Sequence, residues 1–188
     1  MNITVVGLGY VGAVAVAALS KAGHNVLGVD LDQGKVASFQ QGICPFYEPE
    51  LSDLVSAGLQ AGRLRFRVLD EVKEPLGEII LVAVGTPTQA YGGTDLSQVY
   101  SAIRWIKGHN PGRAVVVMKS TVPPGTGLRL MAEELADSQL KYVFNPEFLR
   151  EGQAVHDWFH PDRIVIGGDD KEATALAKRM YEGIEALF

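Results

Sequence analysis

The feature that most constrains this chain is the segment Val5–Gly12, in which an apolar strand runs directly into the pattern G-x-G-x-x-G. An alanine-rich stretch with helical character follows from Ala13 to Ala22, and a second apolar strand ends at Asp30, eighteen residues after Gly12. A preceding strand, a following helix and an acid at the next strand end are the context in which this pattern binds a dinucleotide. The sequence therefore predicts such a site, and a glycine-rich turn without a ligand is the weaker interpretation.

Each feature of the pattern has its own physical reason. Gly7 permits a tight turn, Gly9 leaves room for a pyrophosphate beside the backbone, and Gly12 allows close packing of helix and sheet. The first N–H groups of the helix then face the phosphates with the positive end of the helix dipole. Asp30 can accept hydrogen bonds from ribose hydroxyls, and its charge would repel a 2′-phosphate. We therefore expect NAD rather than NADP.

Composition limits the alternatives. The 188 residues fit one domain, 47% of them are hydrophobic, and the net charge of −5 gives no reason to expect nucleic acid or an anionic membrane as a partner. The chain contains no apolar run of membrane-spanning length, and its single cysteine, Cys44, suits a reducing compartment. Because the chain opens on a strand pattern, we expect no signal peptide. We expect a cytoplasmic protein. The four histidines lack metal-ligand spacing, so no metal site is expected; they are His24, His109, His156 and His160.

Apolar segments and helical segments alternate along the chain, which is typical of an α/β fold. The predicted strands are Ile3–Val6, Asn25–Val29, Leu64–Val68, Ile79–Val84, Ala114–Met118, Tyr142–Phe144 and Arg163–Ile166. The predicted helices are Tyr10–Ala22, Asp32–Gln41, Glu50–Ala57, Leu96–Lys107, Gly127–Ala136 and Lys171–Leu187, with Asp95 and Asp170 as N-caps of the helices that follow them. Together they indicate one doubly wound, mostly parallel sheet of Rossmann type, in a single domain over residues 1–188.

Three loops that follow predicted strands carry unusual chemistry. They are Gly85–Thr88, Lys119–Thr126 and Asn145–Gly152, which combine prolines with hydroxyl groups and carboxylates. Ordinary turn chemistry explains any one of them. In a parallel sheet, however, all three lie at the same edge as the glycine-rich turn, and their convergence there favours a site.

These loops give the chain a resemblance to a known family. Together with Gly7–Gly12, Val29–Asp32, Pro45–Pro49 and Pro161–Gly167, they resemble, in the same order, the N-terminal domain of the UDP-glucose/GDP-mannose 6-dehydrogenases. The segment Asn145–Gly152 is most similar to the UDP-glucose members. The resemblance implies an NAD-dependent, four-electron oxidation of a nucleotide sugar's primary alcohol, in which UDP-glucose becomes UDP-glucuronate.

The resemblance also implies roles for individual residues. The positions expected to bind the cofactor are Gly7, Leu8, Gly9, Tyr10, Val11, Gly12, Asp30, Lys35, Gly85, Thr86, Pro87, Ser120, Thr121 and Glu151. Those expected to contact the sugar nucleotide are Glu147, Phe148, Leu149, Arg150 and Glu151. Thr121, Glu147 and Glu151 are the expected catalytic residues, through a hydroxyl and water network and through proton handling.

The family implies further parts that this sequence does not show. Its members are about twice as long, use a cysteine in the C-terminal half as a covalent nucleophile, and dimerise through a long central helix. Cys44 does not match that nucleophile, because the loop around it shows no pattern that stabilises a thiolate. We therefore expect the NAD-binding half of an enzyme that needs its C-terminal domain for turnover and is a homodimer at full length.

Several interpretations remain open from the sequence. The substrate could be GDP-mannose or a UDP-N-acetylhexosamine, and a β-hydroxyacid dehydrogenase shares the glycine pattern but lacks the segment Asn145–Gly152. A short module that binds NAD or a sugar nucleotide without turnover is the alternative from another class. Glu147 and Glu151 could be solvated loop acids, Arg150 a surface charge, and Lys119 either a contact to substrate or the end of a strand.

Overall fold

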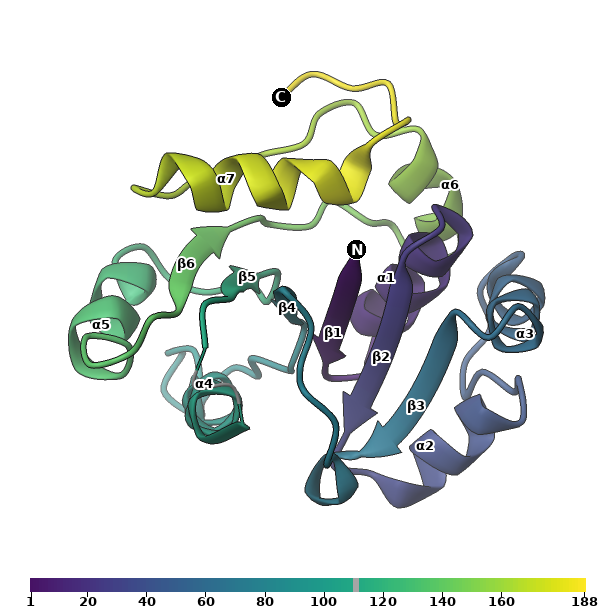
Figure 1. Cartoon of the computed structure of the whole chain (residues 1–188), viewed down its shortest axis with the longest axis horizontal. Coiled ribbons are helices and arrows are strands. Elements are labelled where there is room, and N and C mark those ends of the chain that lie inside the picture. The colour runs from purple at the N-terminus through teal and green to yellow at the C-terminus, as the bar shows by residue number, and fades with distance from the viewer. Residues whose placement is uncertain (110–111) are drawn as a thin grey trace.

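A central sheet of parallel strands organises the molecule, whose computed structural model describes residues 1–109 and 112–188. Six strands pair in the order β3-β2-β1-β4-β5-β6, all parallel (Figure 1). They are β1 (Asn2–Val6), β2 (Asn25–Asp30), β3 (Leu64–Val68), β4 (Ile79–Val82), β5 (Val115–Met118) and β6 (Lys141–Phe144). The predicted doubly wound parallel sheet is thus confirmed.

Helices cover both faces of the sheet because successive side chains of each strand point to opposite faces. Ile79 and Leu81 pack with the helices of one face, whereas Ile80 and Val82 pack with those of the other. The first face carries α1 (Tyr10–Lys21), α2 (Gln33–Gln40), α3 (Leu51–Gln60), α6 (Ala154–Phe159) and α7 (Lys171–Lys178). The second carries α4 (Ser97–His109) and α5 (Thr126–Glu133). None of the helices described is long and apolar enough to cross a membrane.

Helix α1 lies deep in the first layer. Every residue from Gly12 to Ser20 is buried, and most of them are alanine or valine. Small side chains let the helix axis approach the sheet on one side while α3 and α6 pack against it on the other. This packing fixes the amino-terminal end of α1 directly beyond the carboxyl end of β1.

The strand order changes direction between the neighbouring strands β1 and β4. From β1 the chain continues to β2 and β3 on one side of the sheet, whereas from β4 it continues to β5 and β6 on the other side. The Gly7 N–H donates to the Val29 carbonyl oxygen at 2.9 Å, and the Ala83 N–H donates to the Val6 carbonyl oxygen at 2.8 Å. These bonds tie the first residue after β1 to β2, and the first residue after β4 to β1, at one edge of the sheet. In open parallel sheets, ligands bind at such a point of reversal.

The predicted strand over residues 163–166 is wrong. Within this segment there is one isolated bridge, between Arg163 and Leu187, and a second follows it, between Gly167 and Phe144. The Asn145 side-chain amide donates to the Val165 carbonyl oxygen at 2.8 Å, so a side chain replaces a ladder hydrogen bond there. The apolar run is therefore an edge segment beside β6 and not a seventh strand.

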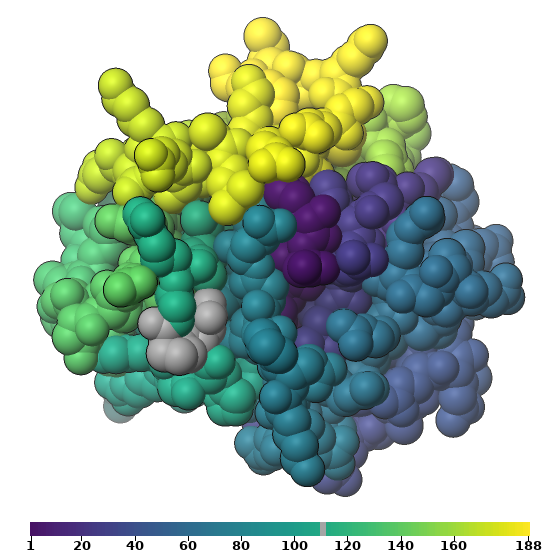
Figure 2. All heavy atoms as spheres, in the orientation of Figure 1, coloured from purple at the N-terminus to yellow at the C-terminus, as the bar shows by residue number. Residues whose placement is uncertain are grey.

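The predicted helix over residues 171–187 is too long. Helix α7 ends at Lys178, a 3₁₀ turn η2 (Arg179–Tyr181) follows, and Gly183 then adopts a φ of 88°, which a helix does not allow. Asp170 caps α7 as predicted, since its side chain accepts the Ala173 N–H at 2.9 Å. In Figure 2, the final residues (yellow) lie at the surface beside the N-terminal residues (purple).

Smaller differences concern helix ends. Helix α6 has only six residues, too few for a periodic pattern, and the sequence did not predict it. Helix α4 begins at Ser97, one residue later than expected, and Asp95 accepts the Ser97 N–H at 2.8 Å. A second 3₁₀ turn, η1 (Leu69–Glu71), follows β3.

Candidate functional site

A cleft of about 480 Å³ opens at the carboxyl ends of β1, β2 and β4, where the strand order changes direction. The predicted cofactor residues that line it are Gly7, Gly9, Asp30, Lys35 and Gly85. Helix α4 supplies the opposite wall through Ser97, Gln98, Ser101, Ala102 and Trp105. The cleft therefore has one side rich in backbone atoms and one side formed by the side chains of a helix.

The three glycines of the turn have different surroundings. Gly7 has a φ of 95°, and a Cβ there would lie 2.7 Å from the Ala83 carbonyl oxygen. A Cβ on Gly12 would lie 1.9 Å from the Gly7 carbonyl oxygen, so this glycine is required for the turn itself. A Cβ on Gly9 would meet nothing within 4 Å. Only the middle glycine thus leaves open space, which fits the close approach of a pyrophosphate to this backbone.

Asp30 forms the charged end of the cleft. Its carboxylate accepts the Leu8 N–H at 2.7 Å, the Asp32 N–H at 3.0 Å and the Lys35 ammonium at 3.0 Å. Burial alone would raise the pKa of Asp30, but the two backbone N–H groups and Lys35 hold it below its usual value. A carboxylate offers about four acceptor positions. Asp30 is therefore ionised, fixed in place and still able to accept a hydrogen bond from a ribose hydroxyl.

Other predicted cofactor residues lie outside the lining of this cleft. The Leu8 side chain is fully buried, so only its backbone faces Asp30. Ser120 is also buried, and its hydroxyl donates to the Val84 carbonyl oxygen at 2.8 Å, which ties the loop after β5 to the loop after β4. Val11 is half-buried against the core, Pro87 and Thr121 are exposed, and Thr86 is half-buried. Contacts from these residues to a cofactor stay predictions.

A second cavity, of about 250 Å³, lies beyond the carboxyl ends of β5 and β6. The predicted substrate residues that line it are Glu147, Phe148, Leu149 and Arg150, whereas Glu151 is exposed outside this lining. The Glu147 carboxylate accepts the Leu149 N–H at 2.6 Å, which fixes its direction within the loop. The structure therefore brings four of the five predicted substrate residues to one cavity.

Lys119 lies at the base of this second cavity and is only 4% exposed. Its ammonium donates to the Tyr181 hydroxyl at 3.2 Å and to the Asn145 side-chain oxygen at 3.4 Å, and it lies 5.0 Å from the centre of the Trp158 ring. Burial lowers the pKa of Lys119 to about 8, and the charge of Glu147 partly opposes this shift. Lys119 is therefore a buried cation that connects the ends of β5 and β6 to η2, and not simply the polar end of a strand.

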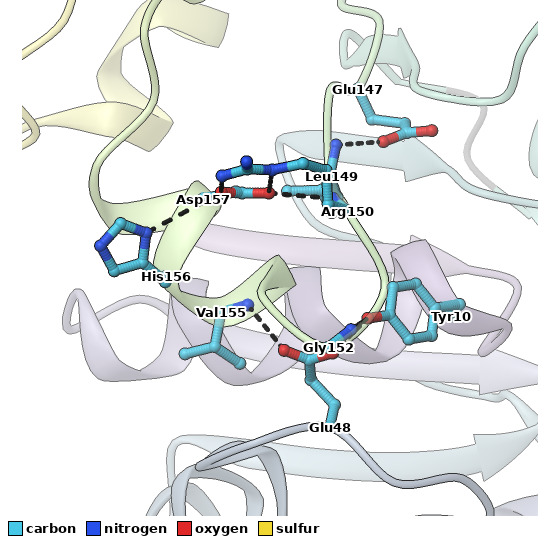
Figure 3. A network of polar contacts seen from close by, with 9 residues as sticks. All are labelled: Tyr10, Glu48, Glu147, Leu149, Arg150, Gly152, Val155, His156 and Asp157. Atoms are coloured by element: carbon cyan, nitrogen blue, oxygen red, sulfur yellow. Dashed lines mark hydrogen bonds and ion pairs between the residues drawn. The ribbon is translucent and has the colours of Figure 1, made fainter.

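Arg150 makes an ion pair with Asp157 of helix α6 (Figure 3). The guanidinium donates to both carboxylate oxygens, at 2.6 and 3.1 Å, and the Arg150 N–H adds a third bond at 2.9 Å. Such a two-pronged contact fixes the orientation of the guanidinium plane. Arg150 thus stabilises the loop in which it lies, and its predicted contact to substrate stays a prediction.

Tyr10 does not line the cleft, and its side chain points toward Gly152 of the loop 145–152 (Figure 3). Its hydroxyl donates to the buried Glu48 carboxylate and accepts the Gly152 N–H at 2.9 Å. The Tyr10 side chain therefore contacts the loop 145–152, called the acidic loop below for its residues Glu147 and Glu151, and does not fill the space beside the glycine turn.

Sequence reasoning missed several residues that line the two cavities. In the first cleft they are Leu69, Gln98, Ser101 and Trp105, and in the second they are Asp157, Trp158 and Tyr181. All lie on helices or 3₁₀ turns, where no motif marks them. Leu31, Asn145 and Arg163 also line the cavities and lie within segments of the resemblance, which assigned no role to them individually. One signal was present for Gln98, since a polar side chain in the first turn of α4 can reach the loop after β4; its side-chain oxygen accepts the Gly85 N–H at 3.2 Å.

No group of three histidine, cysteine, aspartate or glutamate side chains is arranged to hold a metal ion in the described part of the chain. The rings of His156 and His160 lie tilted against each other with their centres 4.8 Å apart, and both residues are exposed. Cys44 is half-buried, and burial raises its pKa.

The strand order, the glycine turn and the fixed acid together define a dinucleotide-binding domain of the doubly wound class. The sequence profile of the UDP-glucose/GDP-mannose dehydrogenase family, NAD binding domain, matches residues 1–185. The chain belongs to this family of NAD-dependent oxidoreductases, and the part that it contains is the family's NAD-binding domain.

Relatives of known name support this assignment. A UDP-glucose 6-dehydrogenase of Bacillus subtilis is 44% identical over 94% of this chain and 41% of its own length. One of Rhizobium meliloti is 43% identical over 96% of this chain and 43% of its own. The solved structure of a UDP-glucose dehydrogenase from Pyrobaculum islandicum has a TM-score of 0.90 at 37% identity, covering 99% of this chain and 45% of that one. The chain therefore spans less than half the length of the relatives it matches.

Proposed function

We propose that this chain is the NAD-binding part of a nucleotide-sugar 6-dehydrogenase that oxidises UDP-glucose to UDP-glucuronate. The observation that carries the proposal is the cleft at the reversal of the strand order, with an open Gly9 at one end and the ionised Asp30 at the other. The family assignment, and the UDP-glucose 6-dehydrogenases among the relatives, support the substrate. GDP-mannose or a UDP-N-acetylhexosamine are the alternative substrates, since solved GDP-mannose and UDP-N-acetyl-mannosamine dehydrogenases share the fold.

On the cofactor side, the proposal assigns binding to backbone and one carboxylate. NAD, when bound, supplies the hydride acceptor. Gly9 lines the cleft and leaves open space directly before the start of α1. The proposal places the pyrophosphate there, held by the first N–H groups of the helix, and assigns the ribose hydroxyls to Asp30. Lys35 neutralises part of the charge of Asp30 and keeps its carboxylate in position. The negative charge at this position disfavours the 2′-phosphate of NADP.

On the substrate side, the proposal assigns proton handling to the loops after β5 and β6. Oxidation of an alcohol removes a proton as well as a hydride, so a carboxylate or a held water is needed nearby. Glu147 faces the second cavity, and Glu151 and Thr121 are exposed at the same edge of the sheet. Phe148 and Leu149 line the same cavity, and the proposal has them contact the sugar nucleotide.

We further propose that the 188 residues form one domain that binds NAD without completing the oxidation. The resemblance implies a thiolate nucleophile, and burial raises the pKa of Cys44, the one cysteine of the chain, which is the opposite of what such a nucleophile needs. The relatives are more than twice as long as the part matched here. We expect this NAD-binding part to work together with a second, C-terminal domain, in a full-length enzyme that is a homodimer.

Calorimetric titration of the 188-residue chain with NAD and NADP tests the cofactor, and formation of NADH with UDP-glucose tests turnover. We expect NAD to bind at least tenfold more tightly than NADP and no turnover above background. Absence of NAD binding at millimolar concentration, with circular dichroism showing a folded chain, contradicts the cofactor site. Sustained NADH formation contradicts the need for a further domain.

The substrate is tested on a protein in which this domain is joined to the C-terminal half of the Bacillus subtilis relative. A panel of UDP-glucose, GDP-mannose and UDP-N-acetylmannosamine is compared by kcat/KM. We expect UDP-glucose to be preferred. A preference for another nucleotide sugar retains the NAD-binding role and overturns the substrate.

A further inference from the structure

The proposed function leaves one buried carboxylate without a role. Glu48 lies in the loop Pro45–Pro49, far in sequence from both cavities, and is only 4% exposed. Buried carboxylates are costly unless their oxygens accept several hydrogen bonds. The partners of Glu48 therefore indicate what this residue holds together.

Three donors from two distant segments surround Glu48 (Figure 3). One carboxylate oxygen accepts the Tyr10 hydroxyl and the Gly152 N–H, the latter at 2.8 Å, and the other oxygen accepts the Val155 N–H at 3.4 Å. The Tyr10 hydroxyl itself accepts the Gly152 N–H at 2.9 Å. The Gly152 N–H is thus shared between Tyr10 and Glu48, and the three residues form a closed set of contacts.

Each end of this set belongs to a different part of the site. Tyr10 is the first residue of α1 and directly follows Gly9, which lines the cofactor cleft. Gly152 ends the loop 145–152, which carries Glu147 and Glu151, and Val155 lies in the first turn of α6. Glu48 therefore connects the start of the cofactor helix to the end of the acidic loop.

The set is rigid as well as connected. The Tyr10 ring packs against Phe46 of the Glu48 loop, with ring centres 5.2 Å apart. Burial, together with Glu48, raises the pKa of Tyr10 to about 12, so its hydroxyl remains a donor at neutral pH. The Glu48 carbonyl oxygen accepts the Leu51 N–H at 3.2 Å, which anchors the loop to the start of α3. A displacement of the first turn of α1 is therefore transmitted to Gly152, and the reverse holds as well.

We propose that Tyr10 and Glu48 are positioning residues that couple NAD binding at the glycine turn to the placement of the acidic loop 145–152. This rests on the proposed function, because it assumes that NAD binds beside Gly9. Binding of NAD orders the first turn of α1, and the shared Gly152 N–H then holds the loop in the position that the reaction needs. Coupling between sites is reciprocal, so an ordered loop also favours NAD.

Amide hydrogen exchange, followed residue by residue by NMR on the 188-residue chain with and without saturating NAD, tests the coupling. The variants are Tyr10→Phe, which removes only the hydroxyl, Glu48→Gln, and the double variant. Tyr47→Phe is the matched control, because Tyr47 lies in the same loop but is 86% exposed. If Glu48→Gln does not fold, Tyr10→Phe retains the buried carboxylate and the ring packing and still gives the answer.

We expect NAD to slow exchange of the Gly152 and Val155 amides roughly tenfold in the unchanged chain and in Tyr47→Phe, in the usual range of site-to-site coupling. In Tyr10→Phe and Glu48→Gln, exchange without NAD rises and the NAD-dependent slowing falls below about twofold. A merely structural role gives faster exchange in the variants but leaves the NAD-dependent ratio unchanged, and that result overturns the proposal.

Two further outcomes separate this inference from the proposed function. If NAD binds to the unchanged chain but exchange at Gly152 and Val155 does not respond, the coupling is wrong and the cofactor site stands. If NAD does not bind at all, both fail. If Tyr10 and Glu48 act through one set of contacts, the factor by which the double variant reduces the NAD-dependent slowing is smaller than the product of the factors of the two single variants. A factor equal to that product means that the two residues act independently, and this contradicts a shared set of contacts.

Discussion

The two cavities at the carboxyl edge of the sheet are formed in different ways. The cofactor cleft, at the ends of β1, β2 and β4, is formed largely by backbone, by glycines at fixed places and by one ionised carboxylate. The second cavity, at the ends of β5 and β6, is formed by a buried lysine and by charged side chains that bind one another. The first cavity therefore depends on glycines that have no side chain at fixed positions, whereas the second depends on pairs of oppositely charged side chains.

This difference has a physical consequence. In the backbone-built cleft, the turn has no room for a further carbon atom at Gly7 or Gly12. A site of paired charges tolerates changes of shape but responds to pH and to the loss of any one partner. Substitutions at the two cavities should therefore fail in different ways, and four experiments test that contrast.

The largest effect is expected from Gly12→Ala. Its Cβ would overlap the Gly7 carbonyl oxygen, so the turn must open, and we expect a loss of about 3 kcal/mol or more of unfolding free energy together with loss of NAD binding. Gly9→Ala is the matched control: its Cβ has open space, so stability should change by less than about 0.5 kcal/mol while NAD affinity falls. Urea unfolding and NAD titration measure both. Equal stability losses in the two variants contradict the separate roles of these glycines.

The second experiment concerns Lys119→Met and the pH dependence of stability. The pKa of Lys119 is about 8 in the folded protein, against an ordinary lysine value of 10.5, so between these values the unfolded state binds more protons and stability rises with pH. From pH 8 to pH 10 this contributes roughly 2 kcal/mol in the unchanged chain, and the contribution is absent in Lys119→Met. Lys171→Met, on the exposed side of α7, should leave the slope unchanged. Parallel stability curves for the unchanged chain and Lys119→Met contradict the buried cation.

A smaller effect is expected from Asp30→Ala. Loss of the ribose acceptor should weaken NAD binding about tenfold, and the Leu8 N–H and Lys35 lose their partner, which costs about 1–2 kcal/mol of stability. Asp32→Ala removes the cap of α2, whose side chain accepts the Lys35 N–H, and should lower stability while NAD affinity stays within twofold. If both variants weaken NAD equally, Asp30 acts only by holding the turn.

The smallest effect is expected from Arg150→Ala. The variant leaves the Asp157 carboxylate with the backbone N–H of residue 150 and the His156 ring at 3.8 Å, and the midpoint of thermal unfolding should fall by about 3 °C. Arg150→Lys keeps the charge but not the two-pronged contact, so it should recover only part of the loss. Circular dichroism measures both midpoints. An unchanged midpoint means that the Asp157 contact contributes little and leaves Arg150 available to substrate.

The contrast also explains what the sequence could predict. Gly7, Gly9 and Asp30 could be placed together at one edge of the sheet because backbone geometry demands these residue types at this spacing, whatever the rest of the chain does. The strands of the sheet could be found equally well, since buried parallel strands are continuous apolar runs. Local patterns therefore predicted the fold class and the backbone-built part of the cleft.

The paired charges of the second cavity could not be predicted in the same way. Lys119, Asn145 and Tyr181 meet only after β5, β6 and the turn η2 have been placed in space. The same applies to Glu48, whose partners lie 38 and 104 positions away in the sequence. Side-chain networks between distant segments leave no periodic trace, so the sequence left Lys119 and Arg150 undecided and indicated no role for Glu48.

The central position of β1 has a consequence for how the chain is made. β1 is synthesised first, yet one of its edges pairs with β4, which follows much later in the chain. At the usual rate of translation, that edge waits roughly 3–10 s after β2 has emerged. An apolar strand with an open edge associates readily with other chains during such an interval. We expect ribosome-bound chains stalled before residue 79 to recruit chaperones, and chains stalled well beyond β4 to release them.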